Sequence, residues 1–407
     1  MKLDIEFVRA QFPAFSEPSL RGKAFFENAG GSYTCRQVMW RLNRFYRERK
    51  VQPYGAFAAS RIGGDEMDEA RTRLARMLGV QTDEISFGPS TSQNTYVLAQ
   101  AFAGWLAPGD VVVVTNQDHE ANSGVWRRLE ERGVEVREWC MDPSTGHLDI
   151  ADLDPLLDER AKLLCFPHCS NVIGEINPVA QITRLARARG VYTCVDGVSY
   201  APHGIPNLPQ LGADIYLFSA YKTWGPHIGV MYVRRNLALQ LPSQAHYFNA
   251  DKLHKRFTPA GEDHAQEAAM AGVADYNDAI YSHHFKAGRD GTGRAACVSD
   301  LFREAETQLM VPLLDYIATR KDVRLLGPSS ATSRAPTLAL ECQEPGEEVA
   351  KRLAPLGILA GGGEFYAHRA LEGVGVDPAK GVLRLSFVHN ATVDEVDRLI
   401  TALDQVL

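Results

Sequence analysis

The chain has 407 residues, of which 45% are hydrophobic and 23% charged, so it has enough apolar material for a folded protein of two or more lobes. Its formal net charge of −7 and the lack of a basic run argue against nucleic acid or an anionic membrane as a partner. No segment reaches the roughly 18 uncharged apolar residues of a membrane helix, and the first residues lack a secretion-signal pattern. We therefore expect a cytoplasmic protein with small-molecule partners.

The cysteines favour neither a zinc site nor a disulfide framework. Their number is odd, and they lack the paired CxxC spacing of common zinc sites. We expect most of them to be reduced core residues, and we expect no metal ion. They stand at positions 35, 140, 165, 169, 194, 297 and 342.

From about residue 64, helical patterns alternate with short apolar runs, which predicts βαβ units. Because these runs are almost wholly apolar, we expect a mostly parallel sheet of the seven-stranded type, sandwiched by helices. The helical patterns cover 65–79, 92–106, 122–133 and 178–190. The apolar runs cover 84–88, 110–115, 134–139, 161–167, 191–196, 215–219 and 229–233.

After about residue 290 the pattern changes to that of a smaller α+β domain. We predict a large α/β domain over 22–293 and a small domain formed by 1–21 together with 294–407. The helical segments of the small domain are expected at 298–320, 347–357 and 394–407, and its strands at 337–342 and 382–387.

A lysine follows the apolar run 215–219. Lys222 is therefore predicted to lie at the carboxyl end of a strand, where open α/β sheets place their ligand crevice. A single lysine at a strand end more often faces solvent. Other residues must decide whether Lys222 is a surface residue or a reactive amine.

Two further features stand at the ends of neighbouring strands. Asp196 ends the run 191–196 and would hold a heteroaromatic nitrogen protonated, as pyridoxal 5′-phosphate (PLP) requires, or it caps a helix. Ser90, Thr91 and Ser92 stand between a strand and a helix, where hydroxyl and N–H groups can bind a phosphate. Ordinary helix capping explains these three residues equally well.

An amide follows a fourth strand. Asn171, just after the run 161–167, would bond a cofactor's ring hydroxyl or a substrate carboxylate, although asparagine is also a routine turn residue. Together the four features supply a phosphate anchor, a ring-nitrogen acid, an amide donor and an imine-forming lysine. This combination favours PLP chemistry over four unrelated surface residues.

The sequence resembles the fold type I PLP enzymes, and within them the class V aminotransferase and cysteine desulfurase-like group. The resemblance covers nearly the whole chain, and its most specific pieces are VDGVSYAPHG, SAYKTWGPHIGVMYVRR and SNVIGEINPV. It implies PLP as cofactor, Lys222 as the Schiff-base lysine and Asp196 as the partner of the pyridine nitrogen.

The resemblance also implies roles around the cofactor and substrate. Asn171 and Arg384, the latter in GVLRLSFVHN, would bind the substrate carboxylate, for which a bidentate guanidinium is suited. A surface position on an edge strand is the alternative for Arg384. The cofactor side would include Ser90, Thr91, Ser92, Ser199, Ser219 and Tyr221.

The residue that stacks on the cofactor ring is expected in NQDHEANSGVW. Aligning HEAN with the desulfurase pattern puts Glu120 at the stacking position, but a carboxylate cannot stack. We expect a local shift that gives this role to His119, which we also count among the catalytic residues.

A persulfide relay is not expected. Desulfurases of the group carry a cysteine thiolate on a mobile loop before the arginine strand. The equivalent loop here, 358–382, contains no cysteine, and Cys342 precedes it by a helix. The run Gly361 to Tyr366 resembles a desulfurase-like branch with an FYA-type loop, which makes Tyr366 a candidate substrate-binding residue; alternatively, its glycines merely form a turn.

Another departure lies in TPAGEDHAQEAAMAG. Glu262 stands where many relatives place a threonine that reaches the partner subunit's phosphate, and a carboxylate would be repelled there. Either the alignment slips, or this loop brings His264 towards the neighbouring site. We predict a homodimer with shared active sites and list His264 among the substrate-binding candidates.

Three functions remain open on sequence. The first is a PLP enzyme acting on a small amino acid by β-elimination, a C–S lyase related to cysteine desulfurases. The second is a class V aminotransferase or an amino-acid epimerase, which share its early chemistry. The third is a non-catalytic PLP-fold binding protein, against which the set Lys222, Asp196 and Arg384 argues.

Overall fold

The computed structural model describes residues 2–286 and 288–407. Its central feature is a seven-stranded sheet with the order β2-β8-β7-β6-β5-β3-β4. The strands from β7 to β4 are parallel, whereas β8 is antiparallel to both β7 and β2, which confirms the predicted mostly parallel α/β fold. The strands are β2 (Ile85–Gly88), β3 (Val111–Thr115), β4 (Glu135–Trp139), β5 (Ala161–Pro167), β6 (Tyr192–Asp196), β7 (Ile215–Ser219) and β8 (Gly229–Val233).

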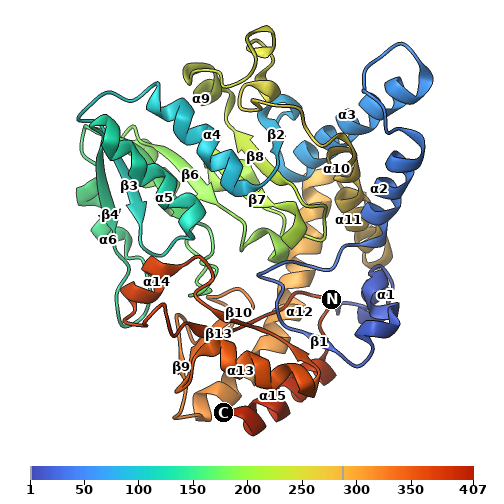
Figure 1. Cartoon of the computed structure of the whole chain (residues 1–407), viewed down its shortest axis with the longest axis vertical. Coiled ribbons are helices and arrows are strands. Elements are labelled where there is room, and N and C mark those ends of the chain that lie inside the picture. The colour runs from blue at the N-terminus through green and yellow to red at the C-terminus, as the bar shows by residue number, and fades with distance from the viewer. Residues whose placement is uncertain (1, 287) are drawn as a thin grey trace.

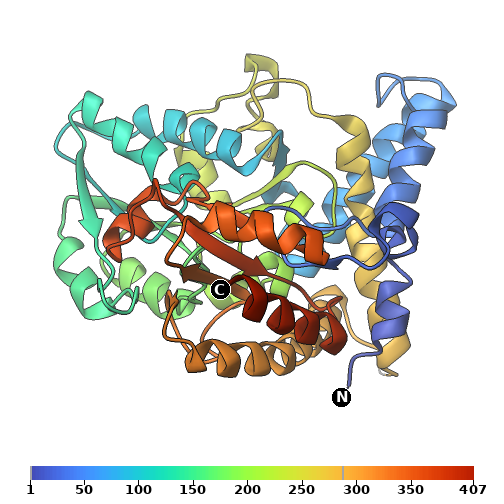
Figure 2. The ribbon, with the colours of Figure 1, turned by 60° about the horizontal axis from the view of Figure 1, so that its bottom comes forward.

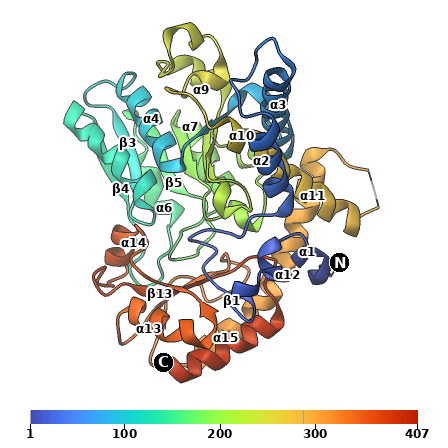
Figure 3. The same cartoon turned by 45° about the vertical axis from the view of Figure 1, so that its right-hand side comes forward.

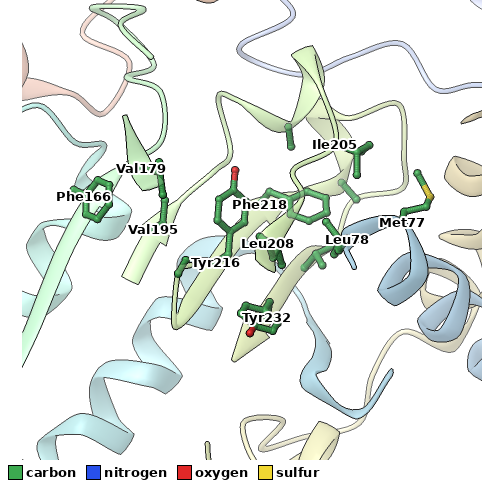
Figure 4. Packing of buried hydrophobic residues seen from close by; sticks show 14 of the residues in the cluster. Met77, Leu78, Phe166, Val179, Val195, Ile205, Leu208, Tyr216, Phe218 and Tyr232 are labelled. Carbon is green, nitrogen blue, oxygen red and sulfur yellow. The ribbon is translucent and has the colours of Figure 1, made fainter. Parts of the chain in front are cut away.

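Helices cover both faces of this sheet, so alternate residues of each strand enter different core clusters. On β3, Val112 and Val114 pack with α4 (Thr91–Ala103) and α5 (Gly124–Arg127), which lie over one face in Figure 1. Residues of the opposite face pack with α7 (Val179–Ala188). Figure 4 shows part of this second cluster, where Phe166, Val195, Tyr216 and Phe218 lie along adjacent strands. Burial on two faces explains the continuous apolar runs.

A group of helices packs at the β2 side of the sheet, to the right in Figure 3. It contains α2 (Arg36–Glu48), α3 (Ala58–Leu78), α10 (His264–Ala269) and α11 (Ala271–His284). Helices α11 and α2 touch through their backbones, because a Cβ at Gly272 would lie 2.6 Å from the Val38 Cα. Helix α3 begins earlier than the predicted residue 65, and the sequence patterns did not single out α2, α10 or α11.

The C-terminal residues form a second lobe, which Figure 2 brings forward. Its antiparallel sheet has the order β12-β13-β10-β9, and α13 (Gly346–Leu353) and α15 (Val393–Val406) share its apolar cluster. The strands are β9 (Arg324–Leu325), β10 (Thr337–Glu341), β12 (Gly361–Gly363) and β13 (Val382–Ser386). The glycines 361–363 therefore form a strand, and the alternative that they merely turn is wrong.

One helix joins the two lobes. In α12 (Gly291–Thr319), Val298 and Phe302 belong to the large core, whereas Leu309 and Leu313 belong to the small one. Near the N-terminus, β1 (Ala24–Phe25) pairs in parallel with β11 (Ile358–Leu359), so this segment also joins the small lobe. The domain division at residues 22 and 293 stays a prediction.

The remaining helices are short. They are α1 (Ile5–Arg9), α6 (Ile150–Leu153), α8 (Leu208–Leu211), α9 (Arg235–Gln240) and α14 (His368–Gly373). The pattern predicted as a helix over 122–133 is only partly α-helical, because α5 continues as a 3₁₀ helix over Arg128–Arg132. Within residues 2–286 and 288–407, no helix has both the length and the apolar character needed to cross a bilayer.

Candidate active site

A pocket opens where β3, β5, β6 and β7 end and α4 begins. Parallel strands bring their carboxyl ends to one edge, so residues far apart in the sequence meet there. Most of the predicted cofactor residues line this pocket, namely Thr91, Ser92, His119, Asn171, Asp196, Ser199, Ser219, Tyr221 and Lys222.

Lys222 lies on the single turn that follows β7, and only 8% of its surface is exposed. Burial lowers the pKa of its amine from 10.5 to about 8, and the charge of Arg384 adds to this effect, while Asp196 and Glu27 oppose it. The alternative of a solvent-facing surface lysine is therefore wrong. An amine with this pKa is partly neutral near physiological pH.

Two buried carboxylates face the same pocket. Asp196, at the end of β6, accepts a hydrogen bond of 2.8 Å from the Val198 N–H. Asp118 follows β3 and accepts from the His119 N–H and the Asn122 amide at 2.9 and 2.7 Å. Burial raises the pKa of both carboxyl groups above the usual range, and the charge of Asp196 raises that of Asp118 further. A cation placed beside them would be strongly favoured.

His119, rather than Glu120, lines the pocket. Its Nδ1 accepts a 3.0 Å hydrogen bond from the Ala121 N–H, which leaves the ring proton on Nε2. Burial lowers its pKa to about 3, with the Lys222 and Arg384 charges contributing, so the ring is neutral. Glu120 faces Arg369 at 3.4 Å instead. His119 therefore has the pocket position, and its stacking on the cofactor ring stays a prediction.

The start of α4 supplies N–H and hydroxyl groups. Ser90 caps the helix by accepting from the Gln93 N–H at 3.1 Å and is not among the lining residues, whereas Thr91 Oγ1 lies 2.8 Å from Ser219 Oγ. The first-turn N–H groups of a helix have no partner inside it and suit an anion. Gly229 lets β8 pack closely against the start of α4, because a Cβ at this position would lie 2.6 Å from the Thr91 nitrogen.

Arg384 is buried on β13, between β12 and β10, so the alternative of an edge-strand surface residue is wrong. Its Nη1 donates to the Asn171 carbonyl at 3.3 Å, and its Nη2 lies 2.7 Å from Glu27 Oε1. The guanidinium stacks 3.7 Å from the Phe365 ring centre. Arg384 thus lies directly behind Asn171 but is already paired.

The segment after β12 lies beside the pocket and contacts Asn171. Phe365 and Tyr366 both have positive φ values, 55° and 54°, which is unfavourable for aromatic residues. Hydrogen bonds of 2.9 Å hold them, from the Asn171 amide to the Phe365 carbonyl and from the Glu120 N–H to the Tyr366 carbonyl. The Tyr366 ring is 70% exposed and lies 5.7 Å from the His119 ring, beside the pocket rather than in it.

His264 lies elsewhere within the single chain. It begins α10, and the adjoining Glu262 pairs with Lys255 and lines a separate cavity with His227. Among the described residues, His264 is outside the Lys222 pocket. Its predicted role depends on a second subunit and stays a prediction.

Sequence reasoning missed four residues at or beside the pocket, namely Asp118, Cys169, Glu27 and Phe365. Asp118 and Cys169 come just after strand ends, as Asn171 does, and that signal would have identified them. Glu27 and Phe365 reach Arg384 only through the tertiary fold, so no local pattern indicates them.

Comparison with known proteins places this site in a family. Residues 24–257 match the sequence profile of the aminotransferase class-V family. The chain belongs to this family. An aminotransferase-like protein of Gibberella zeae is 31% identical over 99% of this chain and 98% of its own. A cysteine desulfurase of Pectobacterium carotovorum is 30% identical over 100% and 98%.

Solved structures show the same fold. The apo cysteine desulfurase of Thermococcus onnurineus superposes with a TM-score of 0.86 at 22% identity, covering 100% of this chain and 98% of that one. A cysteine desulfurase of Escherichia coli gives 0.84 at 21% identity, covering 100% and 99%. The class-V protein is a PLP-dependent enzyme, a transferase or a lyase.

The residues present fit this cofactor. Asp196 is a buried carboxylate with a raised pKa, and a protonated ring nitrogen is the kind of cation that would stabilise its charge. Lys222 offers a buried amine, and the neutral His119 ring can lie against an aromatic ring. Thr91 and Ser92, at the start of α4, suit a phosphate.

We expect the rate at which the PLP-free class-V protein combines with PLP to rise through pH about 8 and then to level off. Only the neutral amine is nucleophilic, and the lowered pKa of Lys222 makes it largely neutral by about pH 9, where an ordinary lysine stays charged. Stopped-flow absorbance measures this rate, with Lys222→Ala as the baseline. A midpoint near the ordinary value of 10.5 would contradict the buried-amine account.

Proposed function

We propose that this enzyme catalyses β-elimination from a small amino acid that carries sulfur on Cβ, as a C–S lyase without a persulfide relay. One observation carries the proposal. The pocket combines an amine whose pKa is lowered to about 8, at Lys222, with a thiol that burial keeps protonated, at Cys169. The first group can move protons, but the second cannot attack sulfur.

In this proposal each pocket residue has one task. Bound PLP would supply an electron sink for the charge that develops when a bond to Cα breaks. Asp196 would keep the ring nitrogen protonated, and His119 would lie against the ring. Thr91, Ser92, Ser219 and Tyr221 would hold the phosphate side, with Ser90 as the cap of α4 and Ser199 near the ring.

The chemical step needs one base. Lys222 Nζ takes the Cα proton, the Cβ–S bond breaks, and the electron pair leaves with sulfur as a thiolate that is then protonated. The released aminoacrylate is hydrolysed by water to pyruvate and ammonium. A buried amine whose pKa lies near the surrounding pH serves both as proton acceptor and as proton donor.

The cysteines support a direct release of sulfur. Cys169 donates to two backbone carbonyls, those of Ser170 and Gly174, at 3.5 Å, and burial raises its pKa to about 12. Cys342 is buried in the small-lobe cluster, with a pKa raised to about 11. A thiolate is the form that accepts sulfur, so neither residue is suited to a relay.

Epimerisation is less well supported. It needs an acid on the face of Cα opposite Lys222, and His119, whose pKa is lowered to about 3, is a neutral imidazole at physiological pH. A neutral imidazole is a weak proton donor. Elimination requires only the amine.

Incubating the PLP-loaded enzyme with S-alkyl cysteines is expected to release pyruvate, ammonium and thiol in equal amounts. The Lys222→Ala variant, which lacks the base, should lose about 100-fold or more of this activity, the usual contribution of a general base. Lactate dehydrogenase coupling measures pyruvate, and a thiol reagent measures the leaving group. A keto acid formed only in the presence of a second keto acid would indicate transamination and contradict the proposal.

The control for direct release is a pair of cysteine variants. Cys169→Ala and Cys342→Ala should keep thiol release within about twofold of wild type, since neither thiol carries sulfur. A large loss of thiol release in Cys169→Ala, with PLP binding intact, would indicate that Cys169 carries sulfur and would contradict direct release.

We also propose a homodimer. Exposed aromatic side chains on α2 support this, since Trp40 is 58% and Tyr46 is 48% exposed, and aromatic residues are enriched at protein interfaces. Size-exclusion chromatography with light scattering should give about twice the chain mass of 44.9 kDa. A fully active species of single-chain mass would contradict the dimer and, with it, the shared role of His264.

A further inference from the structure

The expected carboxylate-binding arginine has an internal partner. Arg384 Nη2 lies 2.7 Å from Glu27 Oε1, with 3% and 26% of the two side chains exposed. A buried arginine alone would attract any carboxylate. Paired with Glu27, it forms a group without net charge, so an added carboxylate gains much less attraction unless another positive charge accompanies it.

The fold makes room for the Glu27 carboxylate. A Cβ on Gly30 would lie 2.6 Å from Oε1, and a Cβ on Gly361 would lie 2.6 Å from Oε2. Neither glycine has a positive φ. Glycine is therefore needed at these positions because a side chain would collide with the Glu27 carboxylate, and not because of the backbone conformation. Glu27 is thus held beside Arg384 by two segments, one from each end of the chain.

Three polar atoms of this cluster remain free. Glu27 Oε2 and Asn171 Oδ1 are buried acceptors without a partner, and Arg384 Nε is a buried donor without one, all within the described chain. Buried polar atoms normally have partners. Two free acceptors and one free donor suit a ligand with a nitrogen that carries several protons next to a carboxylate.

The surface beside the pocket is also acidic. Glu120, Glu364 and Glu372 line a depression together with Tyr366, and Arg369 is the only permanent cation among its lining residues. Tyr366 and Glu120 link this depression to the His119 side of the pocket through the hydrogen bond between their backbones. Such a charge distribution attracts cationic molecules.

We propose that the site selects amino acids whose side chain carries a positive charge, and that Glu27 determines this specificity. The inference rests on the proposed action at an amino acid. The substrate carboxylate takes the free Nε side of Arg384, and an ammonium or guanidinium group on the side chain takes Glu27 Oε2. The Arg384–Glu27 pair then binds an amino acid with a cationic side chain better than one with an uncharged side chain.

Two sulfur amino acids of equal size test this. S-aminoethyl-L-cysteine carries a terminal ammonium, whereas S-propyl-L-cysteine carries a methyl in its place. Titration of the PLP-loaded wild-type enzyme, followed by its absorbance spectrum and by calorimetry, should show binding of the aminoethyl compound that is tighter by about tenfold or more, the usual effect of a hydrogen bond to a charged group. Equal affinities, or no binding of the aminoethyl compound, would overturn the proposal.

The Glu27→Gln variant keeps the size of the side chain and removes its charge. It should weaken binding of the aminoethyl compound about tenfold and leave binding of the propyl compound equal or tighter, because Arg384 is then unpaired. Glu344→Gln, which breaks an exposed pair with Arg352, should change neither. A preference that survives in Glu27→Gln would overturn the assignment to Glu27. If that variant does not fold, the wild-type comparison still decides whether the site prefers a cation.

The outcomes separate this inference from the proposed reaction. Preferential binding of the aminoethyl compound without pyruvate formation would refute elimination and leave the specificity standing. Equal pyruvate formation from both compounds, bound with equal affinity, would support elimination and refute the proposed specificity.

Discussion

Burial of the Lys222 amine at the end of β7 governs the chemistry of this pocket, because an amine removed from water favours its neutral form. The surrounding sheet is what keeps water away. Five parallel strands end at one edge, where Asp196 at the end of β6, Asn171 after β5 and His119 after β3 lie around the amine.

The second constraint is the charge balance around Arg384. Strand β13 carries Arg384, and the N-terminal segment carries Glu27, which lies beside β13 through a backbone bridge to Ser386. The long helix α12 shares residues with both cores and so fixes the distance between the lobes. The positive charge of Arg384 lowers the pKa of Lys222 and His119, while Glu27 opposes this at Lys222. The Arg384–Glu27 pair and the reactive amine are therefore coupled electrostatically.

The sequence predicts the parts of this structure that depend on local pattern. Apolar runs such as 215–219 are unambiguous because both faces of the sheet are covered, and residues at their ends, Lys222 and Asp196, follow directly. Strand β12 could not be predicted, since three glycines have little strand preference and are placed by pairing with β13. The pairing of Glu27 with Arg384 joins residues 357 positions apart and depends on the packing of the N-terminal segment against β13. The choice of His119 over Glu120 depends on one tight turn after β3.

The central claim is that Lys222 is the residue to which PLP attaches, and reduction followed by peptide mapping tests it most directly. Borohydride treatment of the PLP-loaded enzyme fixes the cofactor to its lysine, and proteolysis with mass spectrometry locates it. The account predicts that the reduced cofactor is found on the peptide containing Lys222. Attachment to another lysine, such as Lys255, or recovery of an unlabelled Lys222 peptide from cofactor-loaded enzyme, would contradict it.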